Sequence, residues 1–533
     1  MRAECLPFSQ VPHTTALFAS FLHNFPKVRD LYARPPHDLS WLSADAASLS
    51  FNAVRRARIA AVLERQNRAF NASSEALANI ERLRRGACVV VTGQQVGLFG
   101  GPLFALLKAI TAVRLAAECT ARGQDCVPLF WLASEDHDLA EVESAVLPGG
   151  DGALHTFTAA SLGPEQAPVA AHHFPAQIEQ VVGQAAEILG ESAIVAAMRQ
   201  AYQPGVSFGE AFGRLLAQVF GPHGVILLDA SDPELDVIAA PVFAEAIRRA
   251  AEINAALLAR GERLRRDGFH EQVKVTENST LLFALHREAR TAIHRADGQF
   301  TLGDESLAAA GLLDRIAAHP AGFSPNVLLR PVVQDYLLPT LAYVGGPAEV
   351  AYFAQAAVVY EHLLGHVTPV WPRVSATLVE PHAQRLLERY QLSLADAWHE
   401  PDALRALLAS RVLPGDLQQS FQSALDSLAS SMRPVTAMLE RLDPTLVDAA
   451  GKAEAKMQYQ LTSLQARAAA AEVRRNEVVA RHAAQLGAAL FPHENLQERV
   501  AAGVYFLARY PELLESLRGA ISLTCAGHQV LYF

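Results

Sequence analysis

Two Gly-Gly-Pro triplets, each between an apolar strand-like run and a helix-like run, constrain this chain more than any other feature. They occupy 100–102 and 345–347 of the 533-residue sequence. Proline suits the first position of a helix because its missing N–H would be unpaired there, and a preceding glycine lets another molecule approach the backbone. The free N–H groups at such a helix start attract phosphate or carboxylate. Together the triplets predict a crevice for a doubly anionic or nucleotide-sized ligand, although either one alone is equally consistent with a plain tight turn.

The segments around the triplets predict an α/β fold. Continuous apolar runs that alternate with helix-like segments are typical of a parallel sheet covered on both faces. The expected strands are 87–92, 127–133, 224–229, 340–344 and 367–371. We therefore expect a Rossmann-like doubly wound parallel sheet, preceded by helices over 1–84. Two insertions interrupt it at about 145–222 and 232–323, and the second contains strand-like pieces at 272–275 and 281–284.

We predict three parts along the chain. Residues 1–380 form the Rossmann-like core with its N-terminal helices and connecting-peptide-like insertions. Residues 381–495 form a long all-α arm, in which apolar residues three and four apart predict an antiparallel coiled coil that turns at Asp443-Pro444. Residues 496–533 form a C-terminal helix and an apolar tail that packs back on the core.

Composition and charge exclude several classes of protein. A net charge of −10 and a pI near 6.0 argue against a nucleic-acid binder, which needs clustered Lys and Arg. We expect no membrane segment and no signal peptide, and hence a soluble cytoplasmic protein. The five cysteines include no CxxC and no zinc-like pairing with histidine, so we expect a reducing compartment and no metal site.

Polar residues after the expected strands should converge, because ligands of a doubly wound sheet bind beyond the carboxyl ends of its strands. The densest ionisable cluster follows the second strand, and we take its members as the catalytic candidates: Glu135, Asp136, His137 and Asp138. A histidine beside carboxylates suits a general acid or base. The cluster could equally hold an ammonium group or Mg²⁺, or be a helix start stabilised by acids.

The candidates for binding substrate or nucleotide lie on the same expected rim. They are Thr92, Gly93, Gln94, Gln95, Gly100, Gly101, Asn326, Arg330, Gln334, Gly345, Gly346, Glu349, Arg373 and Ser375. Arg330 could fork onto a carboxylate or phosphate, or form a structural ion pair with Asp335 or Glu349. Lys108, about two turns into the helix after the first triplet, is more simply a solvated surface lysine.

Three long strings and one short one resemble a known family. Residues 92–104, 128–138 and 328–352, with Leu496-Gln-Glu-Arg499 in the tail, look like those of BshC, the cysteine-adding enzymes of bacillithiol biosynthesis. The resemblance spans the whole chain. It implies a Rossmann-like core, a coiled-coil domain and a homodimer. It also implies a ligase that joins the carboxyl group of cysteine to the amine of glucosaminyl-malate in the last step of the pathway.

The cofactor follows less directly from the resemblance. Forming an amide in water needs an activated carboxyl, most simply an adenylate, which would make ATP and Mg²⁺ co-substrates. However, the chain has no Walker A motif and no Gly-x-Gly-x-x-Gly. It also lacks the His-x-Gly-His and Lys-Met-Ser-Lys-Ser motifs of the analogous mycothiol enzyme, so the activating group stays open and zinc is not expected. The competing hypotheses are a non-catalytic nucleotide-binding coiled-coil scaffold and an amide hydrolase that uses the same crevice.

Overall fold

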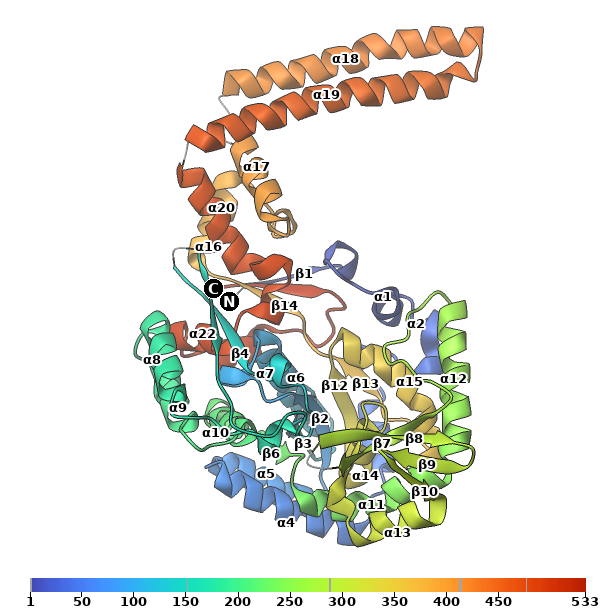
Figure 1. Ribbon diagram of the computed structural model, residues 1–533. Helices are drawn as coiled ribbons and strands as arrows, with labels where there is room; N and C mark the ends of the chain where they lie inside the picture. The colour runs from blue at the N-terminus through green and yellow to red at the C-terminus, as the bar shows by residue number, and fades with distance from the viewer. Residues whose placement is uncertain (1, 151, 287–288, 412–414, 476) are drawn as a thin grey trace. The chain divides into compact units, whose positions relative to one another are not determined.

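The computed structural model describes residues 2–150, 152–286, 289–411, 415–475 and 477–533 (Figure 1). It divides into two compact units. The first comprises Met1–Leu147, His155–Thr377 and Glu498–Leu531, and the second comprises Pro148–Leu154, Leu378–Gln497 and Tyr532–Phe533. None of the helices within the described ranges combines the length and the apolar character needed to cross a membrane.

A parallel sheet lies at the centre of the first unit (Figure 1). Its five described strands are β2 (Cys88–Gln94), β3 (Cys126–Leu132), β6 (Ile226–Asp229), β12 (Thr340–Gly345) and β13 (Val370–Pro372). They lie side by side in the order β13-β12-β2-β3-β6, and all are parallel. Strands β3 and β6, which follow β2 in the chain, lie on one side of it, and β12 and β13 lie on the other side. This order is typical of Rossmann folds, and the predicted fold class is confirmed.

Helices cover both faces of the sheet, and its strands are therefore buried. Val89, Val90 and Val91 of β2 have no exposed surface, as the continuous apolar run predicts. The helices that pack on the sheet include α4 (Ala53–Ala69), α5 (Ser74–Arg85), α6 (Leu103–Ala121) and α15 (Pro347–Leu363). Smaller helices complete this unit: α1 (Ala16–His23), α2 (Phe25–Val28), α3 (Leu42–Ser48), α14 (Arg330–Leu337), α22 (Gly503–Arg509) and α23 (Leu513–Ala520).

The N-terminal segment is not wholly helical, contrary to the prediction for residues 1–84. It begins with a strand, β1 (Arg2–Leu6), which pairs with β15 (His528–Tyr532) near the other end of the chain; β14 (Ala376–Val379) follows in the same sheet. A disulfide between Cys5 and Cys525 adds a covalent link between these two segments, which differs from the reduced cysteines expected of a reducing compartment. The strand was not foreseen because its partner lies more than five hundred residues away.

Two insertions separate the core strands. The first carries α7 (Leu139–Val142), β4 (Ser144–Pro148), β5 (Leu154–Thr158), α8 (Ile178–Leu189), α9 (Ala193–Ala201) and α10 (Phe208–Val219). The second carries α11 (Pro233–Arg248), α12 (Ala250–Arg266), β7 (Ser279–His286), β8 (Ala289–Ala296), β9 (Gln299–Leu302), β10 (Glu305–Ala308), α13 (Ala309–Ala318) and β11 (Phe323–Pro325). Its strands form an antiparallel sheet in the order β10-β9-β8-β7-β11.

The structure confirms one of the two strand-like pieces in the second insertion. Residues 281–284 lie within β7, whereas 272–275 do not form a strand. There, the side chain of Gln355 accepts a hydrogen bond from Val273 N–H at 2.9 Å and donates one to its carbonyl at 2.8 Å. A buried amide from α15 thus takes the place of a neighbouring strand for this extended segment.

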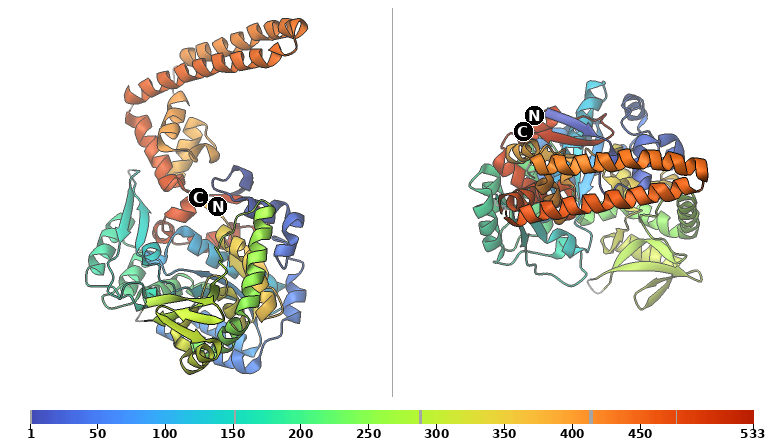
Figure 2. Two further views of the ribbon diagram at one scale, coloured as in Figure 1. Left: turned by 45° about the vertical axis from the view of Figure 1, so that its right-hand side comes forward. Right: turned by 90° about the horizontal axis from the view of Figure 1, so that it is seen from above.

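The second unit is helical and contains the predicted coiled coil. Its described helices are α16 (Pro381–Tyr390), α17 (Pro401–Arg411), α18 (Gly415–Leu442), α19 (Leu446–Arg475) and α20 (Glu477–Leu490), and α21 (Gln497–Val500) begins at its border with the first unit. Helices α18 and α19 run antiparallel, side by side (Figure 2). At the turn between them, Asp443 accepts hydrogen bonds from the N–H and the hydroxyl of Thr445.

Candidate active site

A cavity of about 700 Å³ lies in the first unit at the carboxyl ends of β2 and β12. It is lined by Gly93 and Gln94 from the end of β2 and by Gly346 and Pro347 at the start of α15. This is the point where the strand order reverses, which is where Rossmann-like sheets bind their ligands. A Cβ on Gly93 would lie 3.0 Å from the carbonyl oxygen of Trp131, so glycine is what lets the end of β2 pack beside β3.

The two Gly-Gly-Pro triplets are not equivalent. Gly100 and Gly101 lie outside the lining of the cavity. The N–H of Gly100 donates to the Tyr202 hydroxyl at 3.1 Å, and the carbonyl of Gly101 accepts from the N–H of Gly503 at 3.1 Å. The N–H of Leu103, the first residue of α6, donates to the carbonyl of Ala501 at 2.8 Å. The chain itself therefore covers the first triplet, and the expectation that both helix starts face one ligand is wrong for it.

The second triplet does reach the cavity, but a side chain of its own helix caps it. The N–H of Gly346 donates to Glu349 Oε2 at 2.6 Å, and the Tyr343 hydroxyl donates to Glu349 Oε1 at 2.6 Å. Glu349 occupies the place that a ligand anion was expected to take.

Lys108 is buried, which corrects its interpretation as a surface residue. Its ammonium lies 2.7 Å from Glu349 Oε2 and donates to the carbonyl of Gly93 and to Gln94 Oε1, each at 2.9 Å. Burial acts to raise the pKa of Glu349, but the charge of Lys108 and the hydrogen bonds from Lys108, Tyr343 and Gly346 together hold this pKa below its usual value. A charged pair thus forms part of the cavity wall, and it joins α6 to α15.

The acidic cluster after β3 lines the same cavity, except for Asp138. Asp138 caps α7, with its side chain accepting a hydrogen bond from Glu141 N–H at 3.3 Å. Asp136 accepts hydrogen bonds from Gln95 Nε2 at 3.0 Å and from Arg290 Nη1 at 3.3 Å. The exposed ring of His137 has its Nδ1 3.2 Å from both Asp136 Oδ1 and Arg290 Nη1. Asp136 therefore has a cationic partner inside the protein.

Glu135 differs from its neighbours because its charge is poorly compensated. Its Oε2 atom is inaccessible to solvent and has no hydrogen-bond partner among the described residues. Burial raises the pKa of Glu135 to about 7, although Arg330 and Arg290 act in the opposite direction. A carboxyl group that titrates near neutral pH can accept and release a proton under working conditions. Glu135 is the strongest acid–base candidate of the cluster.

Arg330 supplies positive charge to the cavity. It begins α14, and its guanidinium donates to the Tyr352 hydroxyl at 2.9 Å and to Gln334 Oε1 at 3.1 Å. Within the described ranges no carboxylate oxygen lies within 4.0 Å of it, so the alternative of an ion pair with Asp335 or Glu349 is not what forms. Asp335 instead accepts from the hydroxyl of Tyr360 and from Gln334 Nε2. The charge of Arg330 is available to a ligand anion.

A second cavity of about 530 Å³ adjoins the first. The two share Trp131, Glu135, Arg290 and Pro325 in their linings. Asp236 also lines the second cavity, where burial and then the charge of Glu135 raise its pKa to about 8. Glu135 therefore stands in the wall between two spaces, and two different molecules could approach it.

Of the other predicted residues, some line the first cavity and others lie outside it and hold the surrounding strands in place. Asn326 lines the first cavity, but its Oδ1 accepts from the N–H groups of Leu328 and Leu329. Thr92 is buried and donates to the carbonyl of Val344, which ties β2 to β12. Gln334, Gly345 and Ser375 lie outside the lining.

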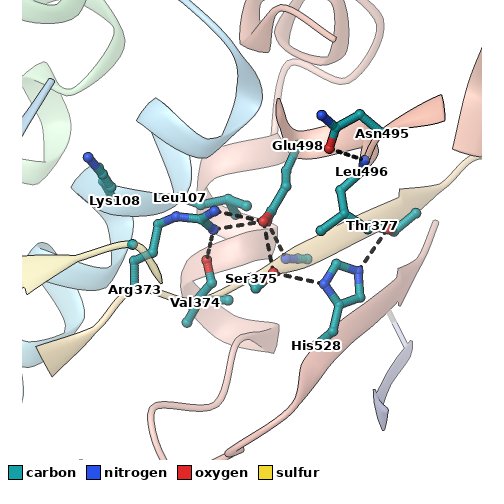
Figure 3. Close-up of polar contacts among 12 residues, drawn as sticks. Leu107, Lys108, Arg373, Val374, Ser375, Thr377, Asn495, Leu496, Glu498 and His528 are labelled. Atoms are coloured by element: carbon teal, nitrogen blue, oxygen red, sulfur yellow. Dashed lines mark hydrogen bonds and ion pairs between the residues drawn. The ribbon is translucent and has the colours of Figure 1, made fainter. Parts of the chain in front are cut away.

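Arg373 lines the cavity but belongs mainly to a buried network (Figure 3). Its guanidinium donates to both carboxylate oxygens of Glu498, at 2.9 and 2.7 Å, and Ser375 donates to the same carboxylate at 2.8 Å. His528 lies 2.8 Å from the hydroxyls of both Ser375 and Thr377, and burial lowers its pKa to about 4. The predicted role of Ser375 in binding is replaced by one in holding segment 498–531 to the core.

Several lining residues were not predicted. They are Phe104, Lys108, Trp131, Glu141, Arg290, Tyr343, Tyr352 and Arg499. For Lys108 a signal existed, because it is the one charged residue in the apolar run 103–113. For Arg290 none existed, since it comes from β8 of an insertion without a recognisable motif.

Comparisons with known proteins agree with this architecture. Residues 1–374 match the family model of the N-terminal Rossmann-like domain of bacillithiol biosynthesis BshC, and residues 376–533 match that of its C-terminal coiled-coil domain. A protein of Koribacter versatilis is 49% identical over 532 residues, which cover 100% of both chains. Relatives from Solibacter usitatus, 32% identical with 100% of both chains covered, and Symbiobacterium thermophilum, 34% identical with 90% of each, are also similar. All three bear the name "Putative cysteine ligase BshC".

The Arg373–Glu498 pair predicts a large effect on stability. Replacing Glu498 by Gln leaves the buried guanidinium without its counter-charge, and we expect a loss of about 3–5 kcal/mol in the free energy of unfolding. Urea denaturation followed by circular dichroism measures it. Glu191→Gln is the matched control, because Glu191 pairs with Arg199 on the surface, where water solvates both charges, and this substitution should leave stability nearly unchanged. Equal effects of the two substitutions would contradict the structural role of the network.

Proposed function

The chain belongs to the BshC family of bacillithiol biosynthesis, and on that premise we propose that it is a cysteine ligase. The reaction joins the carboxyl group of cysteine to the amine of glucosaminyl-malate, as the last step of the pathway. One observation carries the proposal: Glu135, with a pKa of about 7, lies between two cavities at the switch point of the sheet. A ligase needs such a group, because an amine must lose a proton as it becomes an amide.

The charges of the first cavity suit the acceptor. The malate part of glucosaminyl-malate carries two carboxylates, and Arg330 offers a guanidinium with no carboxylate already bound to it among the described residues. Arg499 adds a further cation to the lining. Gln94 and Gln95 suit the hydroxyls of the sugar. The second cavity has several alanines and prolines in its lining, and we assign it to cysteine; Asp236 in its wall would meet the ammonium group of cysteine as a carboxylate only above a pH of about 8.

The chain's own groups have two tasks in the proposed reaction. Glu135 accepts one proton, and Asp136 with Arg290 orients His137. The amine nitrogen attacks the activated carbonyl carbon of cysteine, a C–N bond forms, and the bond to the leaving group breaks. The proton of the amine passes to the carboxylate of Glu135, while Asp136 and Arg290 hold His137 beside the reacting centre. The leaving group is adenylate or phosphate, so ATP with Mg²⁺ is a co-substrate in this proposal, and no step requires zinc.

We also propose a homodimer that forms through the coiled coil, in the cytoplasm where ATP is available. Large apolar side chains of the arm are exposed, including Met438 and Leu442 of α18 and Leu464 of α19. Exposed apolar rows on a two-helix hairpin are expected to pack against a second copy. Light scattering that gives the mass of a single 57.5 kDa chain would contradict this assignment.

The ligase proposal is tested by supplying both substrates. Purified protein is incubated with cysteine and glucosaminyl-malate, with and without ATP and Mg²⁺, and the thiol product, AMP and ADP are followed by mass spectrometry. We expect product only when a nucleotide is present. Nucleotide binding without product would favour the scaffold hypothesis, and release of cysteine from bacillithiol without nucleotide would favour the hydrolase.

Glu135 should govern the pH dependence of the reaction. Its carboxylate accepts the proton only when ionised, so kcat/KM should rise as the pH increases through about 7, the pKa of this group. Glu135→Gln should lower kcat by about 10²–10⁴-fold and remove this limb of the profile. Glu187→Gln, an exposed carboxylate on α8, should leave both unchanged. A Glu135→Gln enzyme that kept the same limb would exclude Glu135 as the proton acceptor.

A further inference from the structure

Three of the five cysteines come together at the edge of the sheet opposite the cavity. Cys88 begins β2, Cys126 begins β3, and these two residues are register partners in the sheet. Cys119 lies in the last turns of α6. The three Sγ atoms all lie within 4.8 Å of one another, and all three residues are buried. This spacing is compact enough for three sulfurs to share one ion.

The surroundings of the sulfurs are apolar. Trp41, Leu42, Val90, Leu115 and Trp371 belong to the same buried cluster. The thiol of Cys88 donates to the carbonyl of Asp125 at 3.4 Å. In the part of the chain that the structure describes, no histidine or carboxylate joins the three sulfurs as a further ligand.

This donor set selects among metal ions. Thiolates are soft ligands and prefer Cu⁺ and Zn²⁺ over hard cations. Zinc in protein structural sites is almost always four-coordinate. Three sulfurs in an apolar environment with no fourth ligand therefore suit Cu⁺ better than Zn²⁺.

We propose that Cys88, Cys119 and Cys126 bind one Cu⁺ ion through three sulfur ligands. On binding, the thiols release their protons to solvent as the S–Cu bonds form, and copper stays in the +1 state. The turn at 121–123, which lies between Cys119 and Cys126 in the chain, is exposed. The bound ion would cross-link α6 to β2 and β3, and it would do so whether or not the chain is a ligase.

The test is a titration of the full-length, reduced protein with Cu⁺ against the competing chelator bathocuproine disulfonate under anaerobic conditions. We expect one equivalent of Cu⁺ to be bound, and Cys119→Ser to weaken binding by at least about 100-fold. The control replaces Cys5 and Cys525 together by Ser, because these cysteines lie outside the cluster and should not contribute. Unchanged affinity in Cys119→Ser, or loss of binding in the control, would overturn the proposal.

Two further measurements cover a variant that does not fold. X-ray absorption of the wild-type protein with one equivalent of Cu⁺ should show three sulfur neighbours and no nitrogen or oxygen neighbour. A parallel titration with Zn²⁺ should give weaker binding. Tighter binding of Zn²⁺ than of Cu⁺, or nitrogen or oxygen atoms around copper, would contradict the three-sulfur site.

Discussion

The ion pair between Lys108 and Glu349 is the contact on which the geometry of the site depends. Lys108 lies on α6, which follows β2, and Glu349 lies on α15, which follows β12, so the pair spans the point where the strand order reverses. Both side chains are largely buried, at 5% and 15% exposure. Removal of either would leave an uncompensated charge in the interior, which costs far more than the pair itself contributes.

Because Lys108 is paired with Glu349, the positive charge that a ligand anion can meet lies on Arg330 and not at the start of α15. The carboxylate of Glu349 accepts a hydrogen bond from the N–H of Gly346 and pairs with the ammonium of Lys108. The N–H at the start of α15 therefore already has a partner within the protein. Attraction for a ligand anion then falls to Arg330, whose partners are neutral groups. The same burial that makes these charges effective raises the pKa of Glu135, because its carboxylate has no strong partner close by.

The sequence was sufficient to predict the sheet and much of the rim. Buried parallel strands are continuous apolar runs, and these can be recognised locally; hence β2, β3, β6, β12 and β13 lie close to their predicted positions. Because parallel strands end at one edge, residues at or just after their ends, such as Gln94, Glu135 and Gly346, line one cavity.

The missed features all depend on contacts between distant parts of the chain. The first triplet is covered by residues 501–503, and Arg290 reaches the site from an inserted sheet. Lys108 looked solvated because its partner Glu349 belongs to another segment. The cysteine cluster is not predictable from the sequence for the same reason. Its members follow no metal-binding spacing and meet only when β2, β3 and α6 pack together.

A crystal structure with glucosaminyl-malate bound would test the central claim most directly. If the cavity is the active site, the amine nitrogen should lie within about 3.2 Å of the Glu135 carboxylate. A malate carboxylate should then lie against the guanidinium of Arg330. An amine turned away from Glu135, or a ligand held outside this cavity, would contradict the account.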